Sequence, residues 1–122
     1  MDHKFRMTTG AVDADTHVVE LQGELDLATT PYIQAALDAA LETGKPFVVL
    51  DLDDVTFVDS TTLAVMLAAH RRLEARGGRL VTVCSDPVDA RVFEITGLTQ
   101  RLSVTGSRRA ALSQAQHFRP AA

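Results

Sequence analysis

The stretch from Val48 to Leu67 constrains the fold of this 122-residue chain most strongly. It begins with an unbroken apolar run, 48–50, which is typical of a strand that helices cover on both faces. Three acidic residues follow: Asp51, Asp53 and Asp54. After a short connection at 55–58, apolar residues recur with helical spacing from Ser60 onward, which predicts a helix. Strand, connection and helix N-terminus in this order indicate an α/β domain, in which such places often bind phosphate.

The rest of the chain alternates strands with helices. We expect further strands at 5–12, 16–22, 79–84 and 102–104, beside the central one at 47–52. We expect helices after Thr30-Pro31, over 60–76, from Asp86 to about Ile95, and after Ser107. The first two strands follow each other directly, so they predict a hairpin. The order therefore predicts a single α/β domain with a mainly parallel sheet, an N-terminal hairpin and about four helices.

Composition excludes several classes of function. The formal net charge of −4 argues against a protein that binds nucleic acid directly, because phosphate contacts need a basic surface. The longest apolar stretch, 63–69, is too short to cross a bilayer, and the first ten residues lack the apolar segment of a signal peptide. No histidine or cysteine lies near His17 at a metal-binding spacing. We therefore expect a cytoplasmic protein without metal or cofactor.

The sequence leaves three possible roles for the Ser60 side chain. It can be an ordinary helix cap, as serine and threonine often are. It can be the substrate of a kinase, because a hydroxyl at a helix start is exposed beside free backbone N–H groups. It can be a nucleophile only if folding brings a base such as His17 or His70 close to it. We do not expect an enzyme, because the chain has neither a nucleophile-elbow motif nor a nucleotide-binding glycine motif.

The three aspartates also suggest a phospho-acceptor receiver domain. That family needs a lysine late in the chain, whereas the two lysines here are Lys4 and Lys45. The chain also begins with two successive strands. We therefore reject the hypothesis of a receiver domain and interpret the three aspartates as a solvated strand end.

Four motifs resemble the STAS domain, and more narrowly the bacterial anti-sigma factor antagonists. They are Gly23-Glu24-Leu25-Asp26, the segment 49–61 with Asp59-Ser60-Thr61, Gly77-Gly78-x-Leu80, and Phe93-x-x-x-Gly97-Leu98. The resemblance is collinear from about Phe5 to Ala115. It implies a STAS domain over 5–116, with flexible termini at 1–4 and 117–122.

The resemblance implies a phosphorylation switch at Ser60, with Thr61 as the alternative acceptor. In that family, a partner that is both anti-sigma factor and serine kinase of the GHKL type phosphorylates the matching serine. The unphosphorylated antagonist binds this partner and frees a sigma factor, and a phosphatase of the PP2C type is a further partner. Asp26 matches an acidic residue near the site, and Asp59 precedes the acceptor.

One position departs from the family pattern. Thr62 stands where the family usually has glycine, so it is expected to crowd a partner or to compete as an acceptor. The resemblance and the helical spacing make Asp26, Asp59, Ser60, Thr61, Thr62, Ala64 and Ala68 the expected partner-binding residues. The alternative function is a STAS module in a stress-signalling or lipid-transport assembly without a switch. We expect a monomer or weak dimer that does not bind membranes.

Overall fold

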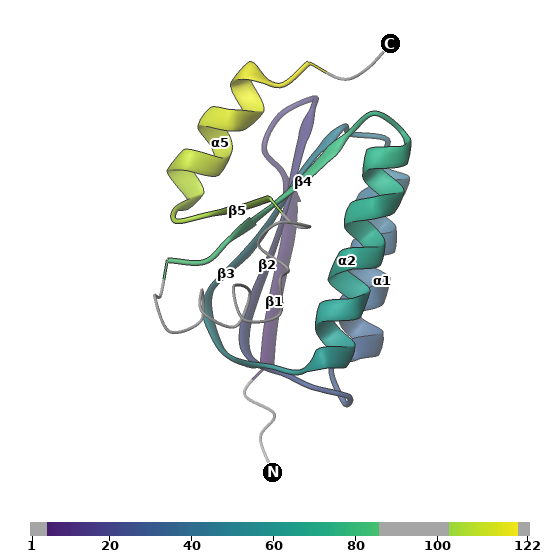
Figure 1. Ribbon diagram of the computed structural model, residues 1–122, viewed down its shortest axis with the longest axis vertical. Coiled ribbons are helices and arrows are strands. Elements are labelled where there is room, and N and C mark those ends of the chain that lie inside the picture. The colour runs from purple at the N-terminus through teal and green to yellow at the C-terminus, as the bar shows by residue number, and fades with distance from the viewer. Residues whose placement is uncertain (1–4, 86–102, 120–122) are drawn as a thin grey trace.

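A five-stranded sheet forms the centre of the computed structural model, which describes residues 5–85 and 103–119. Helices α1 (Thr30–Glu42) and α2 (Ser60–Ala75) cover one face of the sheet. Helix α5 (Arg108–His117) packs on the other face (Figure 1). The described part is thus a three-layer α/β arrangement, as predicted.

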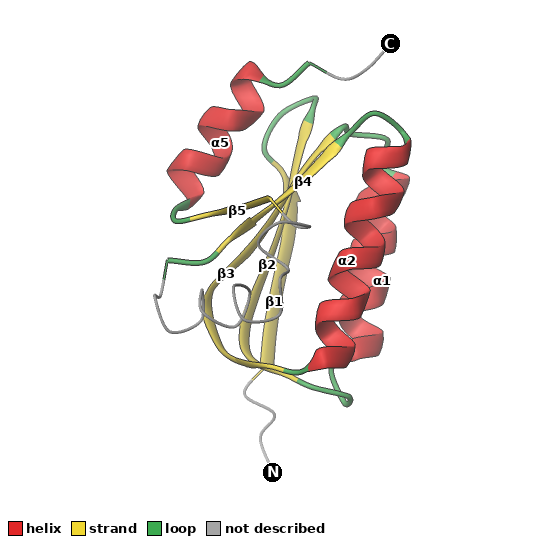
Figure 2. Cartoon of the chain, viewed as in Figure 1, coloured by secondary structure: helices red, strands yellow, loops and turns green. Residues whose placement is uncertain are grey.

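The strands lie in the order of the chain across the sheet (Figure 2). They are β1 (Phe5–Ala11), β2 (Thr16–Leu25), β3 (Phe47–Val58), β4 (Arg79–Val83) and β5 (Ser103–Thr105). The pair β1–β2 is antiparallel and the other three pairs are parallel. This confirms the mainly parallel sheet with an N-terminal hairpin. The structure describes three helices, and the helix expected between Asp86 and Ile95 lies outside the described residues.

The alternation of side chains along β2 divides the core in two. Val19 and Leu21 belong to the larger apolar cluster with α1 and α2, whereas Val18 belongs to the cluster under α5. One side of α1 is buried in the larger cluster, at the helical spacing: Ile33, Ala36, Leu37, Ala40 and Leu41. Apolar faces on both sides of the sheet explain why its central strands are continuously apolar.

Strand β3 is longer than the sequence predicts. We expected residues 55–58 to form a connection, but β3 pairs with β2 through Val58. Two register shifts in this pairing place extra residues in β3, and Val55 returns to the core after the exposed Asp53 and Asp54. The prediction was wrong because two adjacent acidic residues look like a strand end when a bulge is not considered.

Glycines end the second helix, as predicted. Gly77 has φ +79°, which favours glycine, and its N–H donates to the carbonyl of Glu74 at 2.9 Å. A Cβ at Gly78 would lie 2.5 Å from the carbonyl oxygen of Pro46. A side chain there would therefore push α2 away from the start of β3.

Arg108 fixes α5 to the sheet through two carboxylates. Its Nε donates to Asp51 at 2.8 Å, and its Nη2 donates to Glu20. Asp51 is 4% exposed, so our interpretation of it as part of a solvated strand end was wrong. Burial lowers the pKa of Arg108, but the hydrogen bonds and charges of Asp51 and Glu20 outweigh this and raise its pKa. The buried carboxylate is thus compensated by a cation from the last helix.

The other end of α5 is held by an aromatic contact. The ring of Phe118 packs edge-on against that of Phe47, with 5.5 Å between centroids. The guanidinium of Arg79 lies 5.3 Å from the centroid of the Phe118 ring. Helix α5 includes His117, so the ordered structure continues into the segment that we expected to be a flexible tail.

We predict that Arg108→Met lowers the free energy of unfolding by about 2 kcal/mol, because it leaves the buried Asp51 carboxylate without its cation. Arg72→Met is the matched control, because the ion pair of Arg72 with Asp38 is exposed on both sides. The control should unfold close to wild type in urea. Equal losses in the two variants would contradict this account of Asp51.

Candidate functional site

Two chain reversals meet at one end of the sheet, at the bottom of the view in Figure 1. Leu25, the last residue of β2, pairs with Val58, the last residue of β3. The N–H of Asp59 donates to the carbonyl of Leu25 at 3.1 Å. Asp26 and Asp59 directly follow these paired residues. The fold thus brings the two sequence motifs, 23–26 and 59–61, to one edge.

Asp59 is the N-cap of α2. Its carboxylate accepts a hydrogen bond from the N–H of Thr62 at 2.8 Å, and its carbonyl accepts one from Leu63 at 3.1 Å. The interpretation of Ser60 as the cap was therefore wrong, because Asp59 performs this role. Ser60 and Thr61 are both exposed, and within residues 5–85 and 103–119 the Ser60 hydroxyl has no hydrogen-bond partner.

Asp26 shapes the turn that leads into α1. Its carboxylate accepts hydrogen bonds from the N–H groups of Ala28 at 3.0 Å and Thr29 at 3.2 Å. The Thr29 hydroxyl in turn accepts a hydrogen bond from the N–H of Asp26 at 2.9 Å. Thr29 is the N-cap and Thr30 is the first helical residue, so the cap lies one residue earlier than Thr30, after which we expected the helix. Asp26 is thus held rigidly beside the start of α2.

Thr62 faces the core. Its side chain is 0% exposed, and its hydroxyl has no hydrogen-bond partner in the described part of the chain. In this conformation the side chain is out of reach of a kinase or partner. The departure from the family glycine therefore acts through packing beneath the helix start.

The surface around Ser60 combines small and apolar side chains. Ala64 and Ala68 are exposed on the outer side of α2, as expected. Leu27 is 71% exposed in the turn after Asp26. Phe57 is 53% exposed at the same end of β3, but Val58 packs into the α1–α2 core, so Phe57 lies on the other face of the sheet. Our sequence reasoning missed Leu27 and Phe57. The available signal was their position beside the two motifs.

His17 and His70, the two bases that the sequence offered, lie far from Ser60. His17 pairs with Val48 near the opposite end of β3, about 30 Å away along the strand. Burial, and then the charge of Lys45, lowers the pKa of His17. His70 lies ten residues along α2, about 15 Å from Ser60, and its Nε2 contacts Glu74 at 3.0 Å. Neither can act as the base that a nucleophilic Ser60 needs.

Within residues 5–85 and 103–119, no group of three or more histidine, cysteine, aspartate or glutamate side chains could hold a metal ion. None of the helices in these ranges has the length and apolar character needed to cross a membrane.

We predict that Thr62→Val raises the free energy of unfolding by about 1 kcal/mol, because it removes a buried hydroxyl that makes no hydrogen bond. Valine has nearly the shape of threonine and a similar helix propensity. Thr61→Val is the control, since Thr61 is exposed one residue away. Urea unfolding measures both, and a loss of stability in Thr62→Val would show that the hydroxyl has a partner.

Comparison with known proteins identifies the family. The family model described as "STAS domain" matches residues 10–111. The anti-sigma F factor antagonist of Lysinibacillus sphaericus is 33% identical over 71% of this chain and 75% of its own length. The crystal structure of an anti-sigma factor antagonist from Mycobacterium paratuberculosis superposes with a TM-score of 0.86, at 24% identity, over 95% of this chain and 97% of that one.

A second solved structure is similar, that of the Bacillus cell fate determinant SpoIIAA in the phosphorylated form. It has a TM-score of 0.70 and 25% identity, and the match covers 90% of this chain and 99% of that one. The fold, the family model and the curated relative agree with the resemblance seen in the motifs. The chain therefore belongs to the STAS domain family, and the relatives that it matches are anti-sigma factor antagonists.

Proposed function

We propose that this protein is an anti-sigma factor antagonist that phosphorylation of Ser60 switches off. In its unphosphorylated form it binds an anti-sigma factor that is also a serine kinase of the GHKL type, and so frees a sigma factor. The observation that carries this proposal is the exposed Ser60 at the start of α2, with the capping role taken by Asp59. A serine that is exposed and not needed as a cap is available to a kinase.

The relatives support both halves of the proposal. The curated relative is named for antagonism of an anti-sigma factor, and the similar SpoIIAA structure is of a phosphorylated form. We assign the phosphate to Ser60, with Thr61 as the alternative acceptor. A cytoplasmic phosphatase of the PP2C type would restore the active form. The role is one of binding and not of catalysis.

The helix start can accommodate a phosphate without unfolding the domain. In the described residues, no hydrogen bond uses the N–H groups of Ser60 and Thr61. These groups point toward the N-terminal end of α2, where an anion is favoured by about 0.3–1 kcal/mol. A phosphoserine adds about −1.5 to −2 charges at pH 7. The effect of phosphorylation must therefore fall on the partner contact.

The surface around Ser60 explains why the added charge would release a partner. Leu27 supplies exposed apolar area, and Ala64 and Ala68 allow close approach of another backbone. Asp26 and Asp59 already make this edge negative. A phosphate buried against such an interface loses water without gaining a cation. A penalty of about 2.7 kcal/mol, which is a hundredfold loss of affinity, is within this range.

We predict that Ser60→Asp weakens binding of the partner at least tenfold, and that Ser60→Ala binds as well as wild type. The first step is a pull-down from cell extract with each form as bait, followed by mass spectrometry of the retained proteins. Calorimetry with the purified partner then gives the dissociation constants. Ala39→Asp is the charge control, because Ala39 is exposed on α1 away from its N-terminal turn.

Two outcomes contradict the proposal. If all variants retain one partner that is not a kinase, the domain serves another assembly without a switch, such as a stress-signalling or lipid-transport complex. If Ser60→Asp and Ala39→Asp weaken binding equally, a negative charge anywhere on the surface weakens binding, and Ser60 has no special role. Phosphorylation of purified Ser60→Ala by the retained kinase would instead assign the acceptor to Thr61.

A further inference from the structure

The outer edge of β1 is open for pairing. β1 is the first strand of the sheet and, in the described part of the chain, pairs with β2 alone. It has seven residues, contains no proline, and is exposed from Arg6 to Ala11. Its outward N–H and C=O groups therefore form a row that can pair with another strand. Natural sheets usually block such an edge with proline, a bulge or inward charges, and none of these is present in β1.

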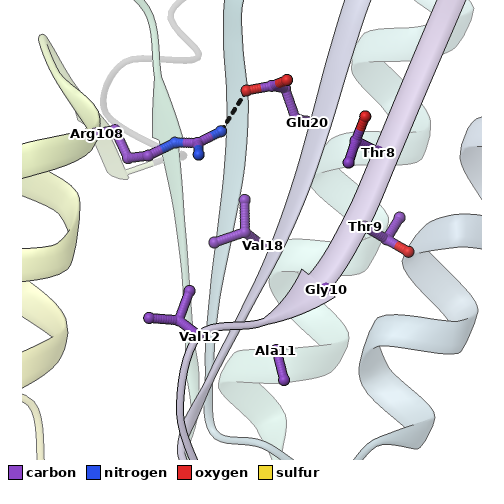
Figure 3. Close-up of a pocket in the computed structure, with 8 residues that line it drawn as sticks. All are labelled: Thr8, Thr9, Gly10, Ala11, Val12, Val18, Glu20 and Arg108. Carbon is purple, nitrogen blue, oxygen red and sulfur yellow. Dashed lines mark hydrogen bonds and ion pairs between the residues drawn. The ribbon is translucent and has the colours of Figure 1, made fainter.

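A groove lies beside this edge, on the face of the sheet that carries α5. The cavity has a volume of about 230 Å³ and is lined by residues of the hairpin and by Arg108 (Figure 3). Glu20 and Asp51 both bond Arg108, so among the described residues this cluster has two carboxylates and one cation. A Cβ at Gly10 would have no atom within 4 Å, so the groove is open on the side of β1. The groove is therefore suited to a cation that enters over Gly10.

We propose that β1 pairs antiparallel with β1 of a second copy of this chain, centred on Thr8. This register overlaps all seven residues of the strand. Thr8 then faces Thr8 of the second copy, Arg6 faces Gly10, and Met7 faces Thr9. The two-fold axis makes each of these contacts occur twice, apart from the central one.

The charges favour this register. Thr8 lies opposite Glu20 in the hairpin, and Arg6 is on the same face as Thr8 because it is two residues away. Arg6 of the second copy therefore lies beside Gly10, next to the groove that contains Glu20. No salt bridge of the described residues uses Arg6 within its own chain. The cation missing from the groove is thus supplied by a second copy.

The opposite face of β1 is also complementary. Met7 is 39% exposed and would contact Thr9 of the second copy. Phe5 would face Ala11, a small residue that leaves room for the contact between Phe5 and Tyr32, whose ring centroids are 6.3 Å apart. Large side chains thus meet small ones across the pair. The proposal does not depend on the function proposed above, since β1 and Ser60 lie on different elements.

The test uses the central position. Thr8→Lys and Thr8→Glu each place like charges directly opposite each other, so each variant should dimerise at least tenfold more weakly than wild type. An equimolar mixture of the two variants places opposite charges there and should restore the dimer. Ala39→Lys, exposed on α1, is the control and should associate like wild type. Sedimentation velocity over a range of concentrations measures all four, and circular dichroism checks that each is folded.

Three results would overturn the proposal. The first is a wild-type protein that stays monomeric at every concentration. The second is a wild-type dimer that neither Thr8 variant weakens, which would place the contact elsewhere. The third is a mixture that stays monomeric although each variant has lost the dimer, because the register centred on Thr8 requires restoration.

Discussion

The full-length pairing of β2 with β3 is the interaction on which the rest of the structure depends. It continues through two register shifts to the Leu25–Val58 pair, and the carbonyl of Leu25 then accepts the N–H of Asp59. Without this last stretch, the turn at Asp26 and the start of α2 would be separate loops. Because both strands end together, two short motifs that are far apart in the sequence form one surface. The site is thus a product of strand register.

Within that surface, neighbouring residues have different structural roles. Asp59 caps the helix, Asp26 closes the turn, and Thr62 packs into the core. The side chains of Ser60 and Thr61 are exposed and form no hydrogen bond with the described residues. Under the proposed function, this separation of roles would let a phosphate at Ser60 alter recognition without removing a contact that the fold uses.

Much of this arrangement follows from the sequence. Helical spacing and capping residues predicted α1 and α2, and apolar runs predicted the central strands, because periodicity directly reflects burial. The motifs predicted the family, and the assignment of Ser60 as the acceptor stays a prediction. The missed features depend on distant contacts: the bulges of β3, the role of Asp59 as cap rather than Ser60, and the burial of Asp51. Sequence could not reveal that the cation for Asp51 is Arg108, since nothing local links them.

The pair of Asp51 and Arg108 joins residues 57 positions apart, and Glu20 is 88 positions from the same arginine. Among the described residues, the cation for this central-strand carboxylate comes from the last helix. Docking of α5 covers that face of the sheet and supplies the cation in the same step. The consequence is cooperativity: the beginning, middle and end of the chain reach the native state together, and partly folded forms lacking α5 are disfavoured.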